Sequence, residues 1–275
     1  MNSYKFIDCH SHPYDSMYDK QGIDIDQKLS ELKELGGATI AIGTDYENTK
    51  KAIMLAQKHE NVFATIGIHP ADNHAENYDE KKFEELLELG KGKVVGIGEC
   101  GLDYFYFAKR GLSAEEIENE KARQKSIFQD QIEFAKKHNL PLVIHGRPTA
   151  NSMDAYRDIL DILEAHTGLR GHAHFFVGNQ EITDRFLKLG FLLSFDGPIT
   201  FSAEYDNVIK NIPLESIMIE TDSPYASPLP HRGKINFPEY VVYVAKKIAE
   251  LKEVDEDEVL SATMENAKKL FRLSI

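Results

Sequence analysis

Two histidines one residue apart, His10 and His12 in the stretch "KFIDCHSHPY", directly follow a short apolar run near the start of the chain. In an extended strand, residues i and i+2 point to the same face, so the two imidazoles are expected to project together. Two imidazoles aimed at one point suggest a metal ion, although a pair of half-exposed loop histidines explains this motif alone equally well. The rest of the sequence has to distinguish the metal site from the pair of loop histidines.

Short apolar runs alternate with amphipathic segments along the whole chain, a pattern that predicts repeated βα units and a parallel sheet. The expected strands cover residues 5–8, 39–42, 62–68, 94–98, 142–145, 171–174, 191–195 and 217–220. The expected helices cover residues 26–35, 48–58, 80–89, 114–138, 152–166, 180–189, 203–211 and 238–251, with a further helix at 257–271.

This alternation predicts an α/β fold, a closed (β/α)8 TIM barrel with an extra C-terminal helix, as one domain over residues 1–275. An open doubly wound sheet is the alternative. It would be expected to carry a glycine-rich phosphate loop after the first strand, where this chain has "CHSHPY". The sequence therefore favours the barrel.

Potential metal ligands stand at the ends of several expected strands, where TIM barrels place their active sites. They are His10, His12, Glu99, His145, His174 and Asp222. A single buried histidine is usually only hydrogen-bonded, but six potential ligands at one end of a barrel predict a metal centre.

The residue types also limit the metal. Histidines with carboxylates suit borderline ions such as Zn, Mn, Fe or Co, whereas an all-oxygen site would suit Mg or Ca. An open catalytic zinc site uses about three protein ligands, so six predict two divalent metal ions, and Glu99 could bridge them. We keep Zn, Mn and Mg as candidates.

The formal net charge of −13 argues against a broad basic surface for nucleic acid, but it does not exclude a local basic site. No stretch approaches the roughly 18 apolar residues that span a bilayer, and no basic segment precedes an apolar leader, so we expect a cytoplasmic protein without membrane contact. No obligate protein partner is evident. Cys9 and Cys100 are expected to be core thiols that point outward toward the helices, not metal ligands.

Several motifs together resemble the TatD family of metal-dependent hydrolases over nearly the whole chain. They are "IDCHSHPY", "GIHP" at 67–70, "GECGLDY" at 98–104, "VIHGR" at 143–147, "HFFVG" at 174–178 and "ETDSPY" at 220–225, followed by "HRGKINFP". The resemblance implies a TIM barrel of the amidohydrolase type, a one- or two-metal centre and, often, metal-dependent deoxyribonuclease activity. The family's metal ligands fall on the same six residues.

The resemblance also implies accessory residues. It places Asp103 close to the centre and makes His69, after the third strand, face the substrate. This chain departs from the family where "HFFVG" stands in place of "HCFSG" and where Cys100 replaces a residue that is often hydrophobic. The added His172 lies two positions before His174 and is expected one layer deeper, as a core residue or a partner of the ligands.

The predicted reaction is attack of a metal-activated water on a phosphodiester of DNA, with Asp222 accepting the proton. Arg147 and Arg232 are the expected phosphate donors, and Tyr104 and Phe105 could stack a nucleobase. One alternative is a hydrolase of a small-molecule ester, lactone, amide or phosphoester that uses the same centre. A non-catalytic binding barrel is less favoured, because every ligand position holds a competent residue.

Overall fold

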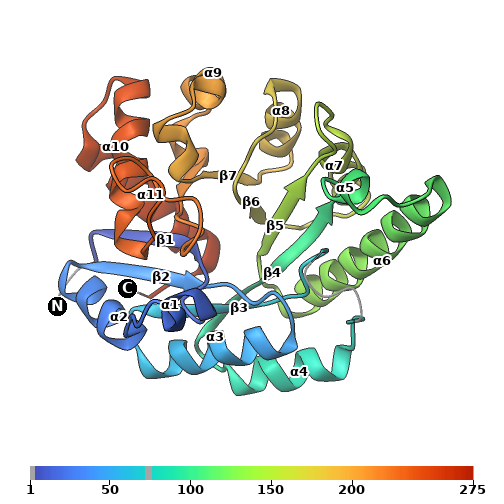
Figure 1. Ribbon diagram of the computed structural model, residues 1–275, viewed down its shortest axis with the longest axis horizontal. Coiled ribbons are helices and arrows are strands. Elements are labelled where there is room, and N and C mark those ends of the chain that lie inside the picture. Colours follow the sequence, from blue (N-terminus) through green and yellow to red (C-terminus); the bar gives the residue numbers. More distant parts are fainter. Residues whose placement is uncertain (1–3, 72–75, 275) are drawn as a thin grey trace.

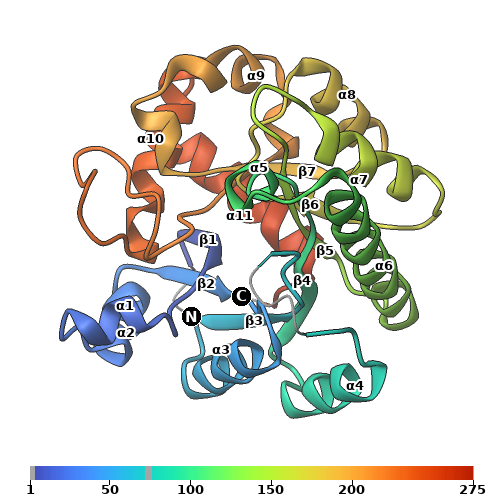
Figure 2. The same ribbon diagram turned by 45° about the vertical axis from the view of Figure 1, so that its right-hand side comes forward.

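The computed structural model describes residues 4–71 and 76–274. Its strands are β1 (Phe6–Ser11), β2 (Gly37–Ala41), β3 (Val62–Ile66), β4 (Val94–Asp103), β5 (Leu142–Arg147), β6 (Gly171–Ala173), β7 (Leu192–Phe195) and β8 (Ile217–Ile219). All eight form one sheet in sequence order, and neighbouring strands pair in parallel. A parallel bridge between Ser11 and Ser223 joins β1 to the segment that follows β8, so the sheet is a nearly closed barrel (Figure 2). The predicted fold is confirmed.

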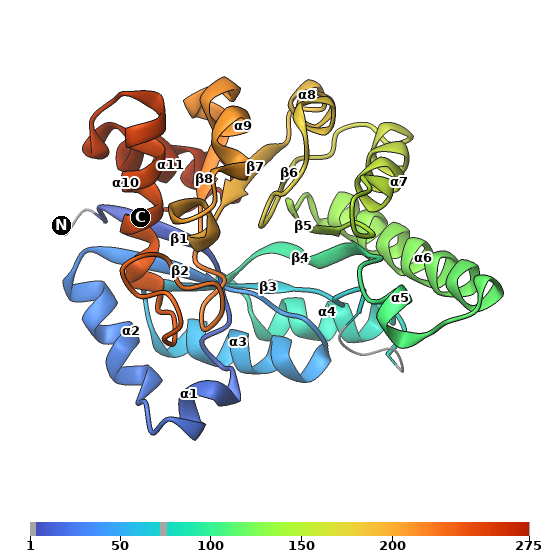
Figure 3. The ribbon, with the colours of Figure 1, turned by 45° about the horizontal axis from the view of Figure 1, so that its top comes forward.

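Helices surround the barrel (Figures 1 and 3). They are α2 (Ile25–Glu34), α3 (Tyr46–Lys58), α4 (Glu80–Leu89), α6 (Ala114–His138), α7 (Asp154–Glu164), α8 (Gln180–Lys188), α9 (Asp206–Asn211) and α10 (Val241–Lys252). Two short helices that the sequence did not predict, α1 (Ser16–Lys20) and α5 (Phe107–Arg110), follow β1 and β4. Within the described residues, no helix has both the length and the apolar character needed to cross a bilayer.

Polar side chains set the starts of several helices. Asp45 accepts a hydrogen bond from the backbone of Asn48 at the start of α3, and Ser113 and Glu116 form a reciprocal capping box at the start of α6. These side chains satisfy amide groups that have no partner inside the helix. The starts of α3 and α6 are therefore fixed by side chains of the connections that precede them.

The core has two parts. The larger lies between barrel and helices, and a smaller cluster combines Ile7, Ile40, Val143 and Met218 of four strands with Phe271 and other side chains of α11 (Glu256–Phe271). Arg170, which precedes β6, donates to the Leu270 carbonyl, and Asn266 of α11 donates to the Ile217 carbonyl at the start of β8. The extra helix thus closes the N-terminal end of the barrel, opposite the strand ends that carry the predicted ligands.

The two cysteines differ in orientation. Both are fully buried, and Cys100 packs in the larger cluster between barrel and helices, as predicted. Cys9 belongs to the smaller cluster inside the barrel, so the prediction that it points toward the surrounding helices is wrong. The register of β1 against β2 shifts between Asp8 and Ser11, which breaks the simple alternation on which that prediction depended.

Candidate metal centre

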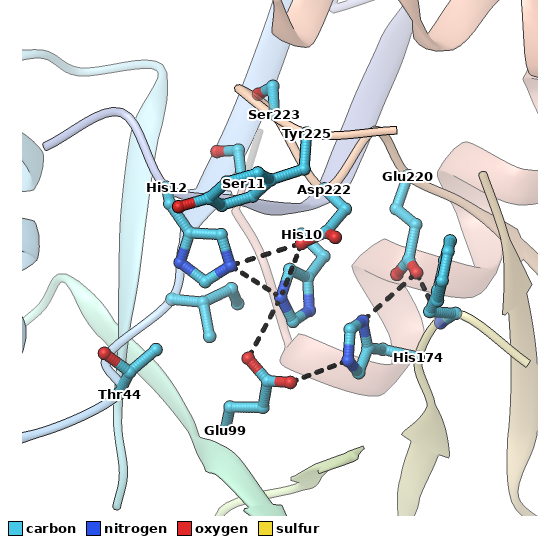
Figure 4. Close-up of polar contacts among 12 residues, drawn as sticks. His10, Ser11, His12, Thr44, Glu99, His174, Glu220, Asp222, Ser223 and Tyr225 are labelled. Carbon is cyan, nitrogen blue, oxygen red and sulfur yellow. Dashed lines mark hydrogen bonds and ion pairs between the residues drawn. The ribbon is translucent and has the colours of Figure 1, made fainter. Parts of the chain in front are cut away.

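The barrel brings all six predicted metal ligands to one point at the C-terminal ends of its strands. Glu99, on β4, lies in the middle (Figure 4). Its Oε2 is 3.3 Å from His10 Nε2, and its Oε1 is 2.7 Å from His174 Nε2 and 2.8 Å from His145 Nδ1. One carboxylate therefore faces a histidine group on each side.

The group on the first side comes from β1 and the segment after β8. His10 Nε2 and His12 Nε2 are 3.2 Å apart, and Asp222 Oδ1 lies 3.3 Å from His12 Nε2 and 3.7 Å from His10 Nε2. We call His10, His12 and Asp222 the seam group, because they lie where β1 and β8 meet.

The group on the second side comes from β5 and β6. His145 Nδ1 and His174 Nε2 are 3.3 Å apart, and both face Glu99 Oε1. We call His145 and His174 the mid-barrel group. Among the described residues, His10, His12 and Glu99 form one set whose donor atoms are close enough to share a cation, and Glu99, His145 and His174 form another.

The donor chemistry fits divalent cations. The Tyr14 hydroxyl donates to the Ile42 carbonyl, so it accepts from His12 Nδ1, 3.1 Å away, and the lone pair of His12 is left on Nε2. In the same way, Asp103 Oδ2 accepts a hydrogen bond from His145 Nε2–H at 3.1 Å, which leaves the Nδ1 lone pair toward Glu99. Such outer partners are typical of metal-binding histidines.

Electrostatics support this assignment. Burial opposes ionisation of Glu99, but His174, His69 and His10 outweigh it and hold the pKa of Glu99 well below its ordinary value. Burial likewise disfavours protonated His145, but Asp103 and Glu99 raise its pKa to about 9. Glu99 is therefore ionised at neutral pH, and a bound cation would take the place of the imidazole protons.

Comparison with known proteins agrees with the geometry. The model of the family described as "TatD related DNase" matches residues 7–272. The chain is 38% identical to the uncharacterized metal-dependent hydrolase YabD of Bacillus subtilis, over 98% of this chain and 99% of that protein. It is 32% identical to YcfH of Escherichia coli, also named an uncharacterized metal-dependent hydrolase, over 97% of this chain and 96% of that protein.

This chain belongs to the TatD family. The crystal structure of YjjV, a TatD homologue from Escherichia coli, superposes with a TM-score of 0.82 at 26% identity, covering 99% of this chain and all of that one. A TatD-family hydrolase from Entamoeba histolytica has the same fold, with a TM-score of 0.80. The protein is accordingly a metal-dependent hydrolase.

In this TatD-family barrel, a cleft of about 780 Å³ opens above the centre. Among the predicted substrate-binding residues, His69, Asp103 and Arg147 line it. His69 Nε2 lies 3.6 Å from Glu99 Oε1, and its Nδ1 is 3.2 Å from the amide of Ala71. Arg232 is not among the lining residues. Its guanidinium lies over the ring of Phe201, 4.0 Å from the ring centre.

The aromatic side chains near β4 differ from the prediction. Tyr104 is fully buried and its hydroxyl donates to Asp158, so the expectation that it stacks a nucleobase is wrong. Tyr106 lines the cleft instead, and accepts a hydrogen bond from Arg147 at 3.2 Å. Phe105 lies beneath the Arg147 guanidinium, 4.2 Å away. Arg110, on the unpredicted helix α5, adds a second cation to this wall.

His172 lies one layer below the ligands. It is fully buried, its ring meets Phe271 edge to face at 5.7 Å, and its Nε2 is 3.9 Å from Glu220 Oε2. Burial lowers its pKa to about 3, so it is neutral in the folded protein at physiological pH.

Sequence analysis missed two fully buried carboxylates next to the centre, Asp8 and Glu220. Burial opposes ionisation of Glu220, but His174 outweighs it and lowers its pKa to about 2. The signal was present, because each stands two positions before a predicted ligand: Asp8 before His10, and Glu220 before Asp222.

Proposed function

We propose that this TatD protein is a phosphodiesterase that cleaves DNA with a water activated at a centre of two divalent ions. The observation that carries the proposal is the position of Glu99, between the seam group and the mid-barrel group at the floor of an open cleft. Zn, Mn and Mg remain the candidates for the ions.

Bound between these groups, divalent ions would lower the pKa of a water molecule and polarise a phosphoryl oxygen. His10, His12 and Asp222 would hold one position, His145 and His174 the other, and Glu99 both. Asp222 would accept the proton of the attacking water, a role supported by its position in the cleft lining.

The wall formed by Arg147, Arg110 and Tyr106 would receive the phosphates. Arginine suits this role because its planar guanidinium donates two parallel hydrogen bonds to phosphate oxygens. Tyr106 and the ring of Phe105 hold the Arg147 guanidinium in place. We assign the phosphate contacts to these residues and not to Arg232, which lies outside the cleft lining. His69 would contact the substrate beside Glu99.

The metal-loaded protein should be tested on labelled single- and double-stranded oligonucleotides and on a panel of small phosphoesters, carboxylic esters, lactones and amides. We expect DNA cleavage that a chelator abolishes. A cleft of this volume also suits a small molecule. Efficient turnover of a panel member, with no digestion of either oligonucleotide, would contradict the nuclease proposal and favour the small-molecule hydrolase.

Arg147→Ala tests the phosphate wall. Losing one charge-assisted interaction of about 1.5–3 kcal/mol should lower kcat/KM for DNA roughly 10- to 150-fold, with metal content unchanged. Lys109→Ala is the matched control, because Lys109 also lies over Phe105 but does not line the cleft. An equal fall in kcat/KM in both variants would show that the loss comes from removing a positive charge near the cleft and not from a direct contact of Arg147 with phosphate.

A further inference from the structure

The join between β1 and β8 is built around the carboxylate of Asp8. Its Oδ1 accepts from the Thr221 amide at 2.8 Å, and its Oδ2 accepts from the Thr221 hydroxyl at 2.8 Å and from the Thr39 hydroxyl at 3.2 Å. Asp8 is fully buried. One side chain therefore ties the first strand to both of its neighbours in the barrel.

The seam group depends on the backbone at this join. The Asp222 amide donates to the His10 carbonyl at 2.9 Å, and the His12 amide donates to the Ser223 carbonyl at 2.7 Å. Asp8 Oδ1 also lies 3.3 Å from the His10 amide. Asp222 has a φ of +53°, a left-handed conformation that a non-glycine residue keeps only where its surroundings enforce it.

Glu220 lies behind His174 of the mid-barrel group (Figure 4), as Asp8 lies behind the seam group. It accepts from the Ser194 hydroxyl at 2.6 Å and from the Phe175 amide at 2.5 Å, and its Oε1 is 3.3 Å from His174 Nδ1. The negative charge of Glu220 beside His174 Nδ1 favours a proton on that nitrogen, which leaves the Nε2 lone pair facing Glu99.

We propose that Asp8 and Glu220 are positioning residues with divided tasks. Asp8 holds the seam group by fixing the join between β1 and β8, and Glu220 holds the mid-barrel group by fixing the tautomer and ring orientation of His174. The inference rests on the two-ion centre of the proposed function but not on its substrate.

The test is the affinity of each metal position. Mn²⁺ binding to Asp8→Asn and Glu220→Gln should be followed by calorimetry and equilibrium dialysis, with anomalous diffraction from Mn²⁺-soaked crystals to locate the weakened position. We expect one dissociation constant to rise roughly 10- to 100-fold in each variant while the other stays within about twofold. Asp8→Asn should affect the position at His10, His12 and Asp222, and Glu220→Gln the position at His145 and His174.

Milder variants cover the case in which these proteins fail to fold. Thr221→Val removes one donor to Asp8, and Ser194→Ala removes one donor to Glu220, so each should weaken the same position as its partner variant, by a smaller factor. Asn61→Ala is the control for general destabilisation. Its buried side chain bonds the Leu29 and Gly37 carbonyls, far from the ligands, so it should lower Tm and leave both affinities unchanged.

A double-variant comparison sharpens the assignment. Adding Asp8→Asn to His12→Ala should cause little further loss of metal, whereas adding it to His174→Ala should remove the remaining ion. If Asp8→Asn and Glu220→Gln weaken both positions equally, or lower Tm as Asn61→Ala does without changing either affinity, the divided roles are wrong. Failure of the protein to cleave DNA would leave these metal affinities, and hence this inference, unaffected.

Discussion

At the residue scale, the four carboxylates of Glu99, Asp222, Asp8 and Glu220, at or next to the centre, have different surroundings and hence different chemistry. Glu99 is buried among histidines and faces both groups. Asp8 and Glu220 are buried behind the ligands, where they meet backbone amides and hydroxyls. Asp222 lines the cleft together with Glu99, and because Glu99 faces histidines on both sides, Asp222 is the candidate base.

Asp222→Asn separates the ligand and base roles. The amide keeps one coordinating oxygen and the shape of the side chain but cannot accept a proton. At saturating metal we therefore expect DNA binding to survive and turnover to fall by roughly 10²- to 10⁴-fold, the usual contribution of a positioned general base. Single-turnover kinetics of the metal-loaded variant would measure this. Nearly normal turnover would show that Asp222 serves the fold of the seam and not the chemistry.

His172→Leu should change the response of stability to acid. The folded state holds the pKa of His172 at about 3, against an ordinary value near 6.5, so between these pH values the unfolded chain binds a proton that the folded chain does not. Stability conferred by neutral His172 is therefore lost as pH falls below about 6.5, at up to about 1.4 kcal/mol per pH unit.

Urea unfolding of the chelated wild type and of His172→Leu at pH 4.5, 5.5 and 7.5 would measure this difference. The variant should gain relative stability toward low pH, because leucine has no proton to bind. Parallel stability curves for the two proteins would show that His172 is accessible to protons in the folded state.

At this scale the sequence predicted which side chains converge at the strand ends and was less successful with the cleft wall. His10, His145 and His174 could be found because strand ends in a barrel converge whatever the loops do. Tyr104 and Arg232 lie in connections, and their directions depend on tertiary partners, Asp158 and Phe201, that no local pattern specifies. Glu220 was missed because its role depends on burial behind His174.

At the scale of elements, β4 is the strand that carries Glu99 to its place between the two groups. It continues to Asp103, beyond the predicted end at 98, and pairs Gly101 with His145 of β5. Its glycines account for the shortened prediction, because glycine in a strand pattern usually signals its end. Here they allow close approach, since a Cβ on Gly101 would lie 2.1 Å from the His145 carbonyl oxygen.

Gly67→Ala tests the contact between the end of β3 and Glu99. A Cβ at position 67 would lie 2.2 Å from the Gly98 carbonyl carbon and 2.4 Å from the Glu99 amide nitrogen, so the β4 backbone must move. Because Glu99 serves both groups, we expect weaker binding of both ions and a loss of turnover on the order of 10²-fold. Metal titration and steady-state kinetics would measure it.

Gly96→Ala is the matched control on the same strand. Its nearest contact would be 3.2 Å, with the Pro141 carbonyl, and it does not touch Glu99. It should lower stability slightly and leave metal affinity unchanged. A similar loss of metal in both variants would indicate that β4 tolerates no added side chain anywhere, independent of Glu99.

At the scale of the whole molecule, α11 closes the barrel end that carries no ligands. The sequence predicted this helix from its periodicity, but not that Phe271 packs with Ile7, Val143 and Met218, because such packing depends on the complete barrel. The packing of α11 and the candidate metal centre therefore lie at opposite ends of the same strands. Substitutions at the two ends should have separable effects.

Phe271→Ala tests this separation. Truncating a buried phenylalanine should lower the free energy of unfolding by about 3–5 kcal/mol, while the folded protein still binds both ions at saturation. Urea unfolding and metal analysis on the same samples would show both. Lys269→Ala, on the exposed face of the same helix, should change stability by no more than about 0.5 kcal/mol. Loss of metal in parallel with stability would show that the two ends are coupled.

The join between β1 and β8 also has a consequence for how the protein is made. Asp8 and Thr221 are 213 positions apart, so their contact closes nearly the whole chain into a loop, the entropically most demanding step of assembling the barrel. Glu99, His145 and His174 lie in the middle of the chain and can meet once β4, β5 and β6 are paired. His10 and His12 leave the ribosome first, yet they wait for Asp222, in the last fifth of the chain, before their half of the centre exists. For the proposed two-ion centre we therefore expect metal-binding capacity to develop in two stages during synthesis, because a chain cut off after β7 lacks Asp222.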